Sequence, residues 1–178
     1  MAAALAGLCF WQAASYPWLL MAGSFFCYAR LWFNMLDGMV ALASGKASLN
    51  GEIVNEVPDR VSDVMIFAGV AHSGLCLVPL GYWAAILAVF TAYIGIFGQA
   101  VGVQREFSGI MAKPWRMVTL HIGATILLLQ LWGGWHLPTV WNLTVMDWTL
   151  IVVIAGCLQT VVVRLRRIID ALNRKAAS

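Results

Sequence analysis

The chain has 178 residues, of which 62% are hydrophobic and 11% are charged, and its mean hydropathy is +0.83. A soluble domain of this length needs more charge on its surface, so this composition excludes that class and indicates an integral membrane protein. The net charge of +3 comes from basic residues beside apolar segments, where anionic headgroups account for them, so we do not expect nucleic-acid binding.

Six apolar segments follow one another, over roughly 2–15, 18–44, 51–77, 82–104, 115–132 and 146–168. We predict an all-α bundle of six transmembrane helices in one domain, 1–178, with a polar cavity on its cytoplasmic side. The first segment is short for a span, and we expect a truncated first helix. Turns are predicted at 45–50 and 79–81, and the basic tail 164–178 should continue the last helix.

Lysine and arginine gather in three regions, 46–60, 105–116 and 164–175, whereas the loops near 16–18, 73–82 and 133–147 carry none. Under the positive-inside rule the basic side is cytoplasmic. Alternating the segments through the bilayer then puts both chain ends, and the polar stretch 37–63, on the cytoplasmic face.

A polar stripe ends the second segment. Asn34, Asp37, Gly38 and Ala41 fall at i, i+3, i+4 and i+7, which places them on one face of a helix. The small residues allow a neighbouring helix or a ligand to approach. Arg30, one turn before Asn34 on that face, is expected to form a buried ion pair with Asp37 or another carboxylate.

A second stripe opens the third segment, where Gly51, Asn55, Asp59 and Asp63 recur at every fourth position. Polar residues on neighbouring membrane helices are costly and usually mark a functional site or a wet cavity. Carboxylate and amide oxygens favour Mg²⁺, Mn²⁺ or Ca²⁺. Two interpretations stay open: a metal or substrate site, and a hydrogen-bond network that only holds the two helices together.

Basic residues surround a turn that contains glycine and proline, at Arg105, Lys113 and Arg116. They lie on the same predicted membrane face as the carboxylates and can hold a phosphate. They can equally serve as positive-inside anchors, and the sequence leaves both interpretations open.

The spacing of the two stripes resembles the signature of the CDP-alcohol phosphatidyltransferases, which reads D-x-x-D-G-x-x-A-R, eight residues, then G-x-x-x-D-x-x-x-D. Aligned from position 34, the chain matches this signature at Asp37, Gly38, Ala41, Gly51 and Asp59. It departs from it at Asn34, Leu42 and Asn55. The chain is thus similar to a divergent bacterial branch with asparagine at two of the four aspartate positions.

The resemblance implies an activity: transfer of a phosphatidyl or other substituted phosphate group from a CDP-alcohol, expected to be CDP-diacylglycerol, to an acceptor hydroxyl in phospholipid biosynthesis, with release of CMP. Asp59 is the implied catalytic base. The implied ligands of Mg²⁺ or Mn²⁺ are Asn34, Asp37, Asn55, Asp59 and Asp63. The implied nucleotide contacts are Asp37, Gly38, Ala41 and Gly51. The implied acceptor contacts are Arg105, Lys113 and Arg116.

The resemblance also implies a homodimer in the bacterial inner membrane, surrounded by lipid, with its active site facing the cytoplasm. Two alternative functions stay open. A non-catalytic family member would bind a nucleotide or a lipid headgroup, and the departures Asn34, Leu42 and Asn55 favour it. A small transporter or channel subunit is the third class, although the sequence gives no sign of paired broken helices.

Overall fold

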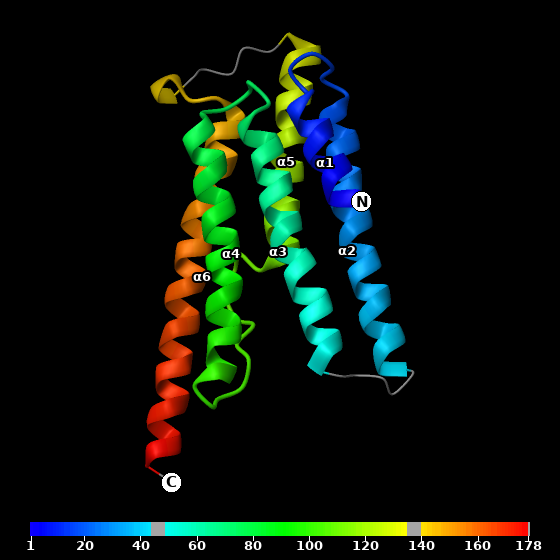
Figure 1. The fold of residues 1–178 in the computed structure, drawn as a ribbon. Coiled ribbons are helices and arrows are strands. Elements are labelled where there is room, and N and C mark those ends of the chain that lie inside the picture. The colour runs from blue at the N-terminus through cyan, green and yellow to red at the C-terminus, as the bar shows by residue number, and fades with distance from the viewer. Residues whose placement is uncertain (44–48, 135–139, 178) are drawn as a thin grey trace.

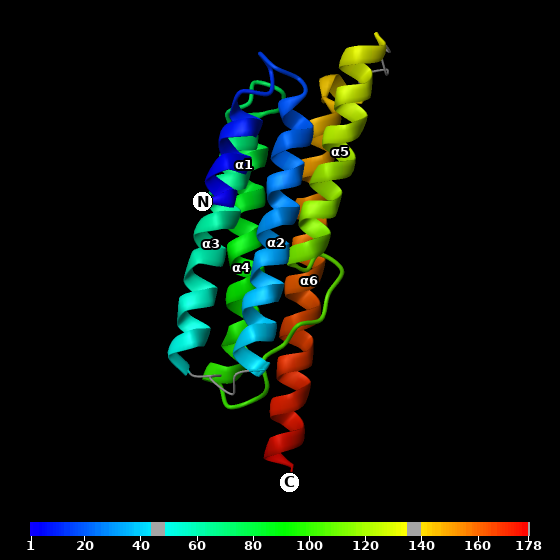
Figure 2. The same ribbon diagram turned by 90° about the vertical axis from the view of Figure 1, so that its right-hand side faces the viewer.

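The structure, a computed structural model, describes residues 1–43, 49–134 and 140–177, and for 37–38, 40–43, 49–55 and 140 it describes the backbone alone. Within these ranges the regular structure is entirely helical. The helices are α1 (Ala2–Trp11), α2 (Leu19–Ala43), α3 (Leu49–Ala71), α4 (Val78–Ala100), α5 (Lys113–Gly133), the short 3₁₀ helix η1 (Val140–Asn142) and α6 (Val145–Ala176). The long helices run alongside one another, and α6 extends beyond the others toward the C-terminus (Figures 1 and 2).

The predicted all-helical membrane fold is confirmed. Four of the helices, α2, α4, α5 and α6, contain stretches long and apolar enough to cross a bilayer. The short α1 has 10 residues, and the first half of α3 carries several charged side chains. The count of six spans therefore remains a prediction.

The short α1 packs tightly against the second half of α3. A Cβ atom on Gly69 would lie 2.2 Å from the carbonyl oxygen of Gly7, and one on Gly7 would lie 2.6 Å from that of Met65. Both glycines are therefore required for the two backbones to approach this closely. Phe10, which is 1% exposed, fills the space between α1 and α2, where a Cβ on Gly23 would meet its ring.

The predicted turn at 79–81 is wrong. Pro79 lies in the first turn of α4, where a proline is tolerated because its missing N–H would have no helical partner. The turn itself precedes this point, because α3 ends at Ala71. Its backbone is held by the buried Asp147, whose Oδ1 accepts a hydrogen bond from the Leu77 N–H at 2.6 Å, while Oδ2 accepts one from the N–H of Thr144 at the start of α6. Of the predicted turn at 45–50, positions 45–48 lie outside the described residues, and positions 49–50 already belong to α3.

The connection after α4 runs back along α4 and beside α6. The N–H of Val103 donates to Gly98 O at 2.9 Å, and that of Glu106 donates to Gly95 O at 3.0 Å. A Cβ on Gly95 would meet both the Arg164 guanidinium and the Glu106 carbonyl oxygen within 3 Å. The small residues of α4 thus give this connection a fixed path. The predicted helical continuation of the last segment is confirmed, since α6 reaches Ala176.

Candidate active site

Asp59 and Asp63 lie one helical turn apart on α3, and the structure gives them different surroundings. Asp63 is fully buried. Its Oδ1 accepts from Arg30 Nη1 at 2.9 Å and its Oδ2 from Arg116 Nη2 at 2.8 Å. One carboxylate therefore joins α2 to α5 across α3. A buried charge is tolerated only with such close partners, so these contacts favour a structural role for Asp63 over the predicted role of metal ligand.

Arg116 is part of this buried cluster. Its side chain is 2% exposed, and Nη1 also donates to the backbone oxygen of Ala88 on α4 at 3.2 Å. It lines the cavity described below, but its guanidinium is committed to Asp63. We therefore assign its main role to the cluster, and the predicted acceptor contact at this position is not supported by these hydrogen bonds.

Asp59 is partly accessible, with 15% of its side chain exposed. Arg30 reaches it with its second terminal nitrogen, at 3.2 Å from Oδ1, and the same nitrogen donates to the Asp59 backbone oxygen at 2.9 Å. The Asn34 amide also donates to Oδ1, and the Lys113 ammonium contacts Oδ2. The prediction that Arg30 pairs with a carboxylate is confirmed: it bridges Asp63 and Asp59.

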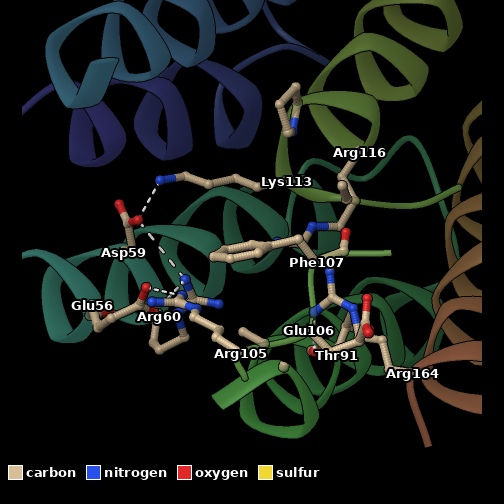
Figure 3. A pocket seen from close by; sticks show the side chains of 14 residues that line it. Glu56, Asp59, Arg60, Thr91, Arg105, Glu106, Phe107, Lys113, Arg116 and Arg164 are labelled. Atoms are coloured by element: carbon tan, nitrogen blue, oxygen red, sulfur yellow. Dashed lines mark hydrogen bonds and ion pairs between the residues drawn. The ribbon is translucent and has the colours of Figure 1, made fainter. Parts of the chain in front are cut away.

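A cavity of about 260 Å³ opens beside Asp59, between α3, α4, the connection after α4, and the start of α5. Figure 3 shows Lys113 and Asp59 pointing toward one another at one side of it, with the Phe107 ring between them and Arg164. Glu56, on the rim, pairs with Arg60 at 3.1 Å and with Arg105. The Arg105 guanidinium lies 4.9 Å from the centre of the Phe107 ring, a cation–π contact that orients it.

The lining of this cavity carries an excess of positive charge. Its basic members are Arg60, Arg105, Lys113, Arg116 and Arg164, and its acidic members are Glu56, Asp59 and Glu106. Five cations against three carboxylates give a formal charge of +2. In a partly dehydrated site this charge favours an anionic ligand, such as a phosphate group.

Arg164 belongs to this site, although its sequence position predicts only a place in the basic tail 164–178. It is 7% exposed and donates to three backbone oxygens, those of Thr91 at 2.6 Å, Ser108 at 2.8 Å and Phe107 at 3.4 Å. It thereby fixes the connection after α4 against α6. Its position after a long apolar stretch, where an arginine is costly, was the signal for such a role.

The structure brings together a subset of the predicted site residues, namely Asn34, Asp59, Arg105 and Lys113. The structure does not describe the side chains of five further predicted site residues, Asp37, Gly38, Ala41, Gly51 and Asn55. Among the described residues, no group of three histidine, cysteine, aspartate or glutamate side chains is placed to hold a metal ion. The predicted metal and nucleotide contacts therefore stay predictions.

Comparison with curated proteins gives three matches, two of them named phosphatidylinositol phosphate synthase, although no family model matches the chain. The inner membrane protein YnbA of Escherichia coli is 28% identical over 136 residues, which are 74% of this chain and 66% of that protein. Phosphatidylinositol phosphate synthase of Mycolicibacterium smegmatis is 29% identical over 157 residues, 85% of this chain and 66% of that protein. The chain thus spans 66% of the length of either relative, just under two thirds.

The fold is that of a solved structure, Mycobacterium tuberculosis phosphatidylinositol phosphate synthase (PgsA1) with CDP-DAG bound. The TM-score is 0.68 at 21% identity, over 94% of this chain and 80% of that one. The fold defines a membrane-embedded helical protein, and its cavity has a positively charged lining. Together with the relatives, this fold confirms the predicted resemblance to the CDP-alcohol phosphatidyltransferases.

Proposed function

We propose that the chain transfers a phosphatidyl or other substituted phosphate group from a CDP-linked lipid, expected to be CDP-diacylglycerol, to an acceptor hydroxyl in phospholipid biosynthesis. One observation carries the proposal: Asp59 stands half-buried at the edge of a cavity whose lining has a formal charge of +2. The fold supports it, because the solved structure that shares this fold holds CDP-DAG. The relatives support it as well, since two of them are named phosphatidylinositol phosphate synthases.

The reaction requires one base and a holder for anionic groups. The acceptor oxygen attacks the phosphorus that carries the diacylglycerol, a new P–O bond forms, and the P–O bond to CMP breaks, so that CMP leaves with the electron pair. Asp59 takes the proton of the attacking hydroxyl. Lys113 and Arg105, both on the cavity wall, hold phosphate oxygens. The acceptor expected from this charge is an alcohol that itself bears a phosphate.

The site offers a divalent ion a small set of oxygen donors. Asn34 and Asp59 touch one another, and Asp37 follows Asn34 by one turn of α2. Asp59 is the single carboxylate at this point among the described side chains, and Arg30 and Lys113 already contact it. We infer a site for one Mg²⁺ or Mn²⁺ held by Asn34, Asp37 and Asp59, with Asn55 as a further amide donor. When bound, the ion would neutralise the diphosphate and make CMP a better leaving group.

The proposed setting is the bacterial inner membrane, with the cavity and both chain ends on the cytoplasmic side. The last turn of α6 carries Arg174 and Lys175 and lies where α6 extends beyond the other helices (Figure 1); the positive-inside rule would place this end on the cytoplasmic side. A homodimer is implied by the family resemblance and forms part of the same proposal.

The activity is tested with purified protein in lipid nanodiscs that contain CDP-diacylglycerol, with Mg²⁺ or Mn²⁺, against a panel of polyols and their phosphate esters. We expect CMP release that requires an acceptor and is fastest with a phosphorylated one. Lys113→Met should raise the KM for the phosphorylated acceptor about tenfold, whereas Lys175→Met, which removes the same charge at the end of α6, should leave it unchanged. Absence of CMP release across the whole panel would contradict the proposal.

A second candidate is a non-catalytic relative that binds a nucleotide or a lipid headgroup. It is favoured by the amides Asn34 and Asn55 at two motif aspartate positions and by the ion pairs that already occupy Asp59. It predicts that CDP binds to the protein while no CMP is released at any concentration of Mg²⁺ or Mn²⁺. Calorimetric titration with CDP, run beside the release assay, separates the two.

A further inference from the structure

A second cavity, of about 470 Å³, lies between the connection after α4 and the part of α6 that follows Arg164. Its polar lining comes from Gln104, Arg105, Glu106, Arg167 and Arg174. This connection leaves the lower end of α4 (Figure 1), and the Lys175 ammonium of α6 donates to its Gly102 O at 2.9 Å. The cavity is therefore formed by two segments that are tied together at its far end.

The wall between the two cavities has a fixed position. Arg105 and Glu106 line both cavities, and the backbone on either side of them is bonded to neighbouring helices. Val103 and Glu106 donate to α4, and Arg164 on α6 donates to Ser108 O at 2.8 Å. The second cavity is thus preformed rather than assembled around a ligand, which lowers the entropic cost of binding.

The net charge of this lining is positive, which favours an anionic ligand. Because Arg105 is already paired with Glu56, the guanidinium groups of Arg167 and Arg174 remain in this lining against one carboxylate, that of Glu106. The closest Arg167–Glu106 approach is 3.7 Å, between Nη1 and Oε1, and Oε1 already accepts the Ser108 N–H at 2.9 Å. This ion pair is too long for a good hydrogen bond.

The nearby charges on α6 do not cancel this excess. The Nε of Arg174 donates to the backbone oxygen of Asp170 at 3.2 Å. This hydrogen bond does not involve the Asp170 carboxylate. Arg166 is exposed on the same stretch of α6 and adds positive charge. The Arg167 side chain is 61% exposed and can therefore turn toward an incoming ligand.

We propose that this second cavity is a binding site for a phosphate group, held by Arg167 and Arg174 and separate from the cavity beside Asp59. Guanidinium forks match the oxygens of a phosphate monoester or diester, and the volume admits a group larger than phosphate alone. The ligand is either the headgroup of an anionic lipid or a soluble phosphate ester. This site goes beyond the proposed transferase function, because it needs neither CMP release nor a metal ion.

The test compares Arg167→Gln with Arg166→Gln, two variants that lose the same charge at adjacent exposed positions. Arg167 lines the cavity and Arg166 does not. In the first arm, each protein in phosphatidylcholine nanodiscs is titrated with inorganic phosphate and binding is measured by calorimetry. In the second arm, nanodiscs with one tenth phosphatidylglycerol are used, and retained lipid is counted by native mass spectrometry. Thermal unfolding confirms that the proteins compared are folded.

We expect Arg166→Gln to behave as the unchanged protein in both arms. Arg167→Gln should weaken binding about tenfold, the size of one lost charged hydrogen bond. A loss in the first arm identifies a soluble phosphate ester, and a loss in the second a lipid headgroup. Ala171→Glu, which adds a carboxylate to the same wall, should reproduce the loss. Equal binding by the Arg166 and Arg167 variants in both arms would overturn the proposal.

Discussion

Asp59 and Asp63 occupy equivalent positions on successive turns of one face of α3, yet they belong to different chemical environments. Asp63 is 0% exposed and is closed in by Arg30 and Arg116 at 2.9 and 2.8 Å. Asp59 borders a cavity, keeps 15% of its side chain exposed, and is contacted by the Lys113 ammonium at the end of a flexible side chain. The comparison separates a carboxylate that holds the bundle together from one that can exchange its partners for a substrate.

Arg30 connects the two environments. One terminal nitrogen bonds Asp63, and the other bonds both the side chain and the backbone of Asp59. The buried cluster of Arg30, Asp63 and Arg116 therefore fixes the position of the Asp59 carboxylate. Catalytic groups need such support from neighbouring residues to hold their geometry.

The largest effect is expected from Asp59→Asn. The amide keeps the size of the side chain but cannot accept a proton, so the rate of CMP release should fall by about 10²–10⁴-fold. Because Asp59 is only partly buried, the unfolding temperature should change little. Asp170→Asn, an exposed carboxylate on α6, is the matched control and should keep full activity.

Asp63→Asn should act on folding instead. Removal of this carboxylate leaves the Arg30 and Arg116 guanidinium groups buried with one partner fewer, which costs about 3–5 kcal/mol. The free energy of unfolding, measured by SDS titration in mixed micelles, should fall by that amount. A further Arg116→Met substitution should cost less in this background than on its own, since the pair is already broken. An unchanged stability of Asp63→Asn would show that the cluster is not structural.

The substitution Lys113→Met tests the proposed metal site. The Lys113 ammonium contacts Asp59 at the point where a divalent ion is expected, so the two cations compete for one carboxylate. Removal of the ammonium should tighten Mn²⁺ binding about tenfold, as measured by electron paramagnetic resonance without substrate. Lys175→Met is the control. Weaker Mn²⁺ binding in the Lys113 variant would argue that lysine and metal do not share Asp59.

The smallest predicted effect concerns Glu106, which lies in the connection after α4. Burial raises its pKa, but hydrogen bonding from Ser108 and the nearby Arg167 charge lower it more, so that the pKa lies below the ordinary value of 4.5. A lowered carboxyl pKa stabilises the fold above the unfolded-state value, and this contribution is lost as the pH falls through the folded-state value. The unfolding temperature of Glu106→Gln should therefore lie below that of the unchanged protein at neutral pH.

The same measurement over a series of falling pH values is the control for this prediction. As the pH falls through the folded-state pKa of Glu106, protonation removes its charge, so the difference in unfolding temperature between the two proteins should close. A gap that persists or widens in acid would mean that the Glu106 charge is not the source of the difference.

The sequence predicted the helices well because apolar length and period are local signals. The extension of α6 to Ala176 and the pairing of Arg30 with a carboxylate could both be anticipated from one chain. Pro79 was misread, since a proline fits a turn and the first turn of a helix equally well, and only the path of the chain decides between them.

The different roles of Asp59 and Asp63 could not be predicted from spacing. Both lie on one face of α3, and the helical period treats them alike. Their roles depend on Arg116, 53 residues further along the chain than Asp63, and on which helix packs over each turn. Arg164 was underestimated for a similar reason, because its partners are backbone oxygens of a distant connection that leave no trace in the side-chain pattern.

The most direct test of the division between the two aspartates is an experimental structure with CDP-diacylglycerol and Mn²⁺ bound in nanodiscs. Our account predicts diphosphate density in the cavity beside Asp59, within hydrogen-bond distance of Lys113 or Arg105, while the ion pairs of Asp63 with Arg30 and Arg116 stay intact. Diphosphate or Mn²⁺ bound at Asp63, with the cavity beside Asp59 empty, would contradict it.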